Sequence, residues 1–75
     1  MNAANNLIRM ANQIGDFFGT MPDRPQAIAD VADHLKRFWE PRMRRALLAH
    51  LDAHGDAELN DMARQAVREH RERLL

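Results

Sequence analysis

Residues 37–45, RFWEPRMRR, place two of the chain's four aromatic residues and four of its eleven cationic side chains around one proline. Proline disfavours the α conformation in the residue before it and fits the first position of a helix. Pro41 therefore predicts a junction at which one helix ends and another begins. The rings and arginines at this junction allow three interpretations: a core anchor, a nucleic-acid contact, or a surface that docks on another protein.

The helix that leads into this junction has the clearest pattern in the chain. Asp23 is suited to cap its start, and Pro25 falls in its first turn, where a missing N–H is harmless. Asp33 and Arg37, spaced i,i+4, predict an ion pair on its solvated side. Its apolar side chains recur at helical spacing over about 120° of arc; they are Ile28, Val31, Ala32, Leu35, Phe38 and Trp39.

The helix that follows the junction is predicted from Pro41 to about His54, where Gly55 ends it. Arg42 and Arg45 point away from its apolar arc, which is made by Met43, Leu47 and Leu51. Arg44 instead falls inside that arc. An arginine in this position either extends past the core edge into solvent or is desolvated against a carboxylate.

Another helix is predicted N-terminal to these two, and Gly19 and Pro22 limit its C-terminal end. Its apolar stripe consists of Leu7, Met10, Ala11, Ile14, Phe17, Phe18 and Met21. Gly15 lies in mid-helix, where glycine costs roughly 1 kcal/mol relative to alanine. It belongs to a strip of small residues beside the apolar stripe, with Ala4, Ala11 and Gly19. Either another helix approaches closely there, or Gly15 is a tolerated surface residue.

The last predicted helix begins after Asn60, a suitable cap, with Leu59 as the apolar residue that precedes the cap. Its stripe continues through Met62, Ala63, Ala66, Val67, His70 and Leu74. The four patterns together predict an all-α fold, a small compact bundle of three to four short amphipathic helices. Residues 1–75 are expected to form a single domain.

Composition excludes several classes of function. The formal net charge is zero, which argues against a protein whose main role is to bind a polyanion. There is no cysteine, serine or tyrosine and there are three glycines, so thiolate ligands, a glycine-rich phosphate loop and a Gly-x-Ser-x-Gly elbow are absent. No basic leader or apolar run of about 20 residues is present. We expect a soluble cytoplasmic protein with no membrane partner.

The histidines are the remaining candidates for chemistry. His50 and His54 are spaced i,i+4 as zinc-binding pairs are, but they lack the glutamate of His-Glu-x-x-His and a convincing third ligand. They are interpreted as surface residues near a helix C-terminus. His70 is expected to be a half-buried ring, and His34 to pair with Asp30. No catalytic, cofactor-binding or metal-binding residue is predicted.

Three segments resemble the delta subunit of the soluble, NAD-dependent, molybdenum-containing formate dehydrogenases. They are LIRMANQIGDFF at 7–18, VADHLKRFWEPRMR at 31–44 and ALLAHLDAHG at 46–55. The resemblance extends over about residues 6 to 75. It is strongest at 38–44, FWEPRMR, and weakest from about residue 56 onward.

The resemblance implies a small non-catalytic subunit of a large complex. In this family the partner subunits hold the molybdenum or tungsten cofactor, the iron–sulfur clusters and FMN, and they oxidise formate to carbon dioxide while reducing NAD⁺. The delta subunit is associated with stability of the assembly and with acquisition of an active molybdenum cofactor. None of these cofactors is expected in this chain, which has no cysteines for clusters and no dinucleotide glycine fingerprint.

The expected interface is the junction itself, because obligate interfaces use buried aromatic and arginine anchors. Trp39 or Phe38 is expected to insert at the large catalytic subunit. The three arginines of the junction are expected to pair with its carboxylates: Arg42, Arg44 and Arg45. Candidates of second rank lie on the first helix: Arg9, Phe17 and Phe18. The alternative is that the rings are core residues and the arginines are solvated.

Other functions also remain open. Residues 36–45 hold five cations and one acid, so the start of the third helix along the chain could instead serve a small helical nucleic-acid-binding module. The chain could act as a permanent subunit or as a transient assembly factor. It could also form a homodimer when it is isolated from its partner.

Overall fold

The computed structural model describes residues 3–75, in which four helices follow one another. They are α1 (Ala3–Phe18), α2 (Arg24–Phe38), α3 (Pro41–His54) and α4 (Asp61–Leu74). Residues 3–75 contain no strand. The predicted all-α bundle of short helices is therefore confirmed.

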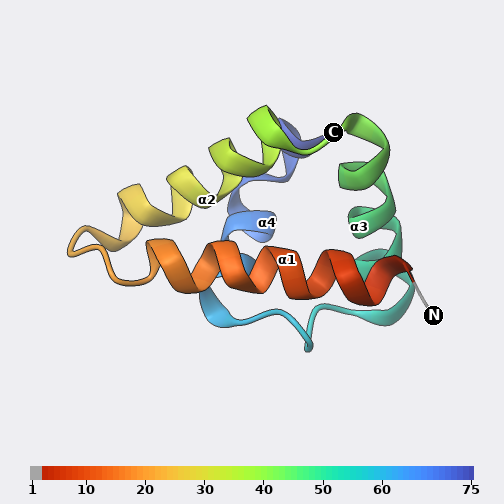
Figure 1. Cartoon of the computed structure of the whole chain (residues 1–75), viewed down its shortest axis with the longest axis horizontal. Coiled ribbons are helices and arrows are strands. Elements are labelled where there is room, and N and C mark those ends of the chain that lie inside the picture. The colour runs from red at the N-terminus through yellow and green to blue at the C-terminus, as the bar shows by residue number, and fades with distance from the viewer. Residues whose placement is uncertain (1–2) are drawn as a thin grey trace.

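The helices surround one shared core. In Figure 1, α1 and α2 diverge from their connecting turn like the arms of a V, and α3 lies at the open end of that V. The last helix, α4, lies behind them and packs mainly against α2, with further contacts to α1 and α3. This arrangement leaves the front of the V, between α1 and α2, uncovered by any other helix.

The boundaries of α2 and α3 lie where the sequence predicts them. The Asp23 carboxylate accepts a hydrogen bond from the Gln26 backbone N–H at 3.2 Å and so caps α2. Pro41 is the first residue of α3. Gly55 follows its last residue with φ of +84°, a conformation that favours glycine.

The core takes side chains from every helix, but α1 contributes a different face from the one predicted. Ile8 is buried, whereas Met10, Phe17 and Met21 are exposed. The reason is that α1 turns its strip of small residues, not the centre of its large apolar stripe, toward α4. The other helices bury most of their predicted stripes, but Phe38 at the end of α2 is exposed and Met43 and His70 are half-buried. The largest fully buried side chains are Val31, Leu35, Leu47, Leu59 and Leu74.

Gly15 marks the point where α4 approaches α1 closely. A Cβ atom at Gly15 would lie 2.6 Å from Asn60 Oδ1 and 3.2 Å from the Ala63 backbone nitrogen. Asn60 Oδ1 also accepts from that Ala63 N–H at 2.9 Å, so Asn60 caps α4 as predicted. The close-approach interpretation of Gly15 is confirmed.

The same asparagine joins the start of α4 to the middle of α1. Its backbone N–H donates to Asn12 Oδ1 at 2.8 Å, and its Nδ2 donates to the Asn12 carbonyl at 2.9 Å. Nδ2 also donates to Asp16 Oδ1 at 3.0 Å. These bonds fix the register between the two helices.

The connection between α3 and α4 is held by Asp56. Arg68 donates two hydrogen bonds to its carboxylate, at 2.7 and 3.1 Å, and Arg64 lies 3.8 Å from it. Hydrogen bonding to the Arg68 guanidinium holds the pKa of Asp56 below its usual value and raises the pKa of Arg68. The pair therefore favours the folded state while Asp56 is ionised.

Gly15→Ala should destabilise the fold by about 1–3 kcal/mol, because the added methyl group displaces the α4 cap. This loss should appear even though alanine favours a helix over glycine by about 1 kcal/mol. Urea unfolding measures the change, with Gln13→Ala on the exposed side of α1 as the control, expected within about 0.5 kcal/mol of the wild type. A variant as stable as the control would contradict the close packing of α4 on α1.

Asp56→Asn should lower the melting temperature at pH 7, and the difference from wild type should shrink as the pH falls below about 4. The sign follows from the lowered pKa: the ionised carboxylate stabilises the fold above the pKa of the unfolded chain, and that contribution is lost as the pH falls through the folded pKa. Thermal unfolding between pH 3 and pH 7 measures both chains. A difference that stays constant over this range would show that the Asp56 charge does not contribute.

Candidate functional site

Arg44 is buried at the junction between α2 and α3, with 7% of its surface exposed. Its Nη1 donates to the Lys36 and Trp39 carbonyls at 2.8 and 2.9 Å, and its Nε donates to the Leu74 carbonyl at 3.3 Å. These carbonyls belong to the end of α2, the junction and the end of α4. Both predicted environments for Arg44 are therefore wrong, because its partners are backbone carbonyls and not solvent or a carboxylate.

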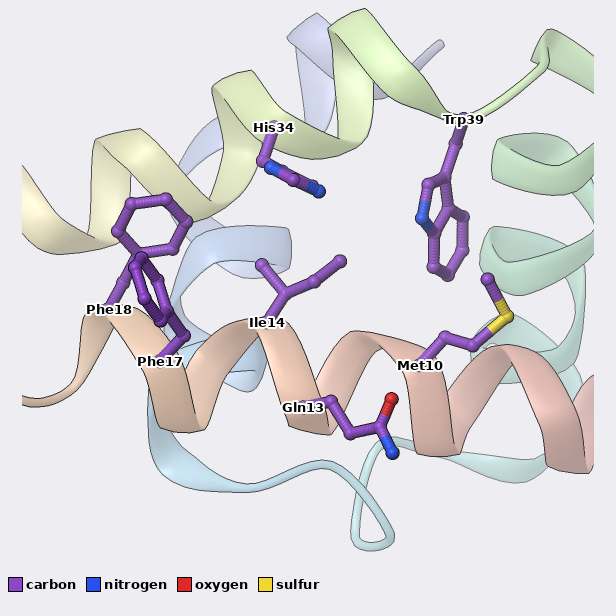
Figure 2. A pocket seen from close by; sticks show the side chains of 7 residues that line it. All are labelled: Met10, Gln13, Ile14, Phe17, Phe18, His34 and Trp39. Carbon is purple, nitrogen blue, oxygen red and sulfur yellow. The ribbon is translucent and has the colours of Figure 1, made fainter.

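Trp39 is also part of the interior, with 5% of its surface exposed and its place in the hydrophobic core. This agrees with the core-anchor interpretation of the ring. Both Trp39 and Arg44 are engaged within the chain, so the insertion of Trp39 into a partner and the pairing of Arg44 with partner carboxylates stay predictions that would require the junction to open. Trp39 also lines one end of a groove (Figure 2).

The remaining predicted interface residues are accessible to different degrees. Phe38 and Phe17 are the most exposed rings, at 72% and 63%. Phe18 is half-buried against the core. The exposed arginines of the set are Arg9, Arg42 and Arg45. The structure thus divides the predicted set into buried junction residues and a surface that extends along α1 and the end of α2.

An open groove of about 330 Å³ lies between α1 and α2. Figure 2 shows Phe17 and Phe18 at one end and Met10 and Trp39 at the other, with Ile14 between them. The polar side chains of its lining are Gln13 and His34. The groove was not predicted from the sequence. The sequence feature that could have indicated it is the strip of small residues beside the large apolar stripe of α1. Because the small residues pack against α4, the large apolar side chains remain on the rim of the groove.

Four rings line up across the groove from α1 to α2. The centroids of Phe17 and Phe18 are 5.1 Å apart, those of Phe18 and His34 are 6.2 Å apart, and those of His34 and Phe38 are 4.7 Å apart. The predicted pairing of His34 with Asp30 is wrong: Asp30 accepts instead from Gln26, at 2.9 Å. Edge and tilted contacts of this kind favour this arrangement of the rings.

The histidines at the end of α3 contact each other and the following loop. The rings of His50 and His54 are 4.8 Å apart, and His50 Nε2 lies 3.4 Å from a carboxylate oxygen of Glu58. Residues 3–75 contain no cluster of three or more His, Cys, Asp or Glu side chains suited to a metal ion. In the same range, no helix is both long and apolar enough to cross a membrane.

The groove and the junction both lie within the part of the chain that matches a known family. The model of the NADH-dependent formate dehydrogenase delta subunit FdsD matches residues 6–67. The chain belongs to this family. The match ends at Val67, so the last turns of α4 lie outside it, although the resemblance had been expected to reach residue 75. Comparisons with curated proteins and with solved structures found no match.

Membership in the delta subunit family makes the chain a subunit of a formate dehydrogenase, which therefore has partner subunits. The structure then raises the question of which surface of the chain contacts the partner subunits. The strongest part of the resemblance, residues 38–44, includes the buried Trp39 and Arg44 beside the exposed Phe38 and Arg42. Part of this signature is therefore explained by folding, and only the exposed residues remain available for binding.

Arg44→Met should destabilise the delta subunit by about 3 kcal/mol or more, because it leaves buried carbonyls without donors. The neighbouring Arg45→Met is the matched control: its side chain is exposed, and the change should stay within about 0.5 kcal/mol. Urea unfolding of the two variants measures the difference. Equal stabilities would mean that the Arg44 bonds to the carbonyls do not hold the junction.

Proposed function

We propose that this delta subunit binds the large catalytic subunit of the formate dehydrogenase through the α1–α2 groove and the rings beside it. By this contact it stabilises the assembly and supports acquisition of the molybdenum cofactor by the large subunit. The observation that carries the proposal is the groove itself, with large apolar side chains left on its rim by a core that is otherwise well packed.

The distribution of exposed apolar side chains supports this surface. The large exposed apolar residues are Met10, Phe17, Met21, Phe38 and Leu75, and the first four lie on α1, its following turn and the end of α2. Apolar side chains grouped in this way on a small domain are typical of a protein–protein interface. Methionine and phenylalanine also suit such a surface, since thioethers adapt to a partner and rings lose little entropy when they are ordered.

We further propose that the chain has no catalytic role. The groove offers one amide and one imidazole, from Gln13 and His34, beside apolar side chains. Molybdenum cofactor, iron–sulfur clusters and FMN are assigned to the partner subunits. The absence of cysteine throughout the sequence supports this assignment for the clusters.

Phe38→Asp and Phe17→Asp should each raise the Kd for the dehydrogenase at least tenfold, about 1.4 kcal/mol, by placing a charge where an apolar contact forms. Both side chains are exposed, so the variants should fold normally. Ala53→Asp adds the same charge at an exposed position near the end of α3 and should bind like the wild type. Calorimetric titration of dehydrogenase purified from a strain without the delta subunit measures the affinity.

The maturation role has a separate readout. Dehydrogenase produced with the Phe38→Asp subunit should contain less molybdenum and show lower formate-dependent NADH production than dehydrogenase produced with Ala53→Asp. Normal binding by both phenylalanine variants would refute the groove as the interface. Weakened binding with full molybdenum content would restrict the function to stabilising the assembly.

A further inference from the structure

Three exposed arginines lie close in sequence to residues at one end of the groove. Trp39 closes this end, and α3 begins two residues later, with Arg42 and Arg45 in its first turns. Arg9 precedes Met10, which lines the same end of the groove opposite Trp39 (Figure 2). Within residues 3–75, none of these three arginines has an acidic partner. The end of the groove beside Trp39, termed here the basic end, therefore has cations available to a ligand.

The opposite end of the groove, at the α1–α2 turn, carries acids. Asp23 caps α2, Asp30 lies one turn before His34, and Asp33 pairs with Arg37 at 3.1 Å. Glu40 lies among the arginines at the basic end, and Arg24 lies beside Asp23 at the turn, so the two ends differ in their balance of charges although each carries both signs. A ligand with acidic side chains at one end is favoured when that end lies beside the arginines, and it is disfavoured in the reverse orientation.

The lining of the groove favours a helical ligand over an extended one. An extended segment would leave its backbone N–H and C=O groups facing apolar side chains, and an unpaired buried backbone group is costly. Gln13 and His34 could satisfy only a few such groups. A helix satisfies its own backbone internally and needs only apolar side chains on the buried face.

The length of the groove fits about two helical turns. Met10 and Phe17 stand at its two ends, seven residues apart on α1, a rise of roughly 10 Å. A ligand helix lying along α1 would place apolar side chains at positions i, i+3 or i+4, and i+7 over the same span. Carboxylates at the end of that helix would then reach the basic end.

We propose that the α1–α2 groove binds an amphipathic helix of the large subunit, with apolar anchors over Ile14 and the rings and with Asp or Glu side chains at the end beside Trp39. Arg42 and Arg45 pair with these carboxylates, and Arg9 does so from the opposite wall. This inference rests on the proposed function, and it adds the secondary structure, charge and orientation of the occupant.

The test compares charge reversals at the two ends of the groove. Arg42→Glu lies in the first turn of α3 and Arg24→Glu in the first turn of α2, where glutamate has a similar interaction with the helix dipole. Arg24 also donates to Gln65 of α4, so the unfolding midpoint of both variants is measured beside the Kd. Both residues are exposed. Arg42→Glu and Arg45→Glu should each raise the Kd for the dehydrogenase five- to tenfold at low salt, with a smaller effect at high salt. Arg24→Glu should change the Kd less than twofold.

Photo-crosslinking identifies the occupant directly. A benzoylphenylalanine placed at Gln13, on the groove wall, should crosslink to a large-subunit segment with apolar residues at helical spacing and with acids at one end. A crosslinked segment without acids, or equal effects of Arg42→Glu and Arg24→Glu, would overturn the inference while leaving groove binding intact. A wild-type Kd for Phe38→Asp would instead count against the proposed function. Binding of duplex DNA that depends on Arg42 at physiological salt would also overturn the inference, since it assigns the basic end to a nucleic acid.

Discussion

The three hydrogen bonds that Arg44 donates to backbone carbonyls hold this small fold together. The last carbonyls of a helix have no partner within the helix, and burying them unpaired is costly. A guanidinium carries five donors in a rigid fork, so one side chain can serve carbonyls from several segments at once. Arg44 thereby joins the end of α2, the start of α3 and the end of α4, and Trp39 fills the space beside it.

Closing the junction from within has a consequence for function. The most distinctive residues of the sequence are partly used for folding, and the surface that we propose for binding is the neighbouring groove. That groove exists because Gly15 lets α4 approach α1, so the small residues of α1 pack and its large apolar residues remain on the rim. In the proposed function, stability and binding therefore belong to different faces of α1.

Helix positions could be predicted from the sequence because their signals are local. Capping by Asp23 and Asn60, the break at Pro41 and the stop at Gly55 each depend on a few adjacent residues. The role of Arg44 could not be predicted in this way, since its partners include the Leu74 carbonyl, thirty residues away. A helical wheel showed that it faces the core but could not show which groups meet it there.

The candidate site was only partly predictable for the same reason. Phe17 and Phe38 could be predicted as candidate interface residues, but their arrangement relative to each other depends on the angle between α1 and α2. Local spacing predicts that His34 pairs with Asp30, whereas its ring contacts Phe18 across the groove and Phe38 on its own helix. The most direct test is a cryo-electron microscopy structure of the delta subunit bound to its dehydrogenase. We predict a large-subunit helix between α1 and α2, with Arg44 still bonded to its three carbonyls. An open junction, with Trp39 inserted into the large subunit and the groove empty, would contradict this account.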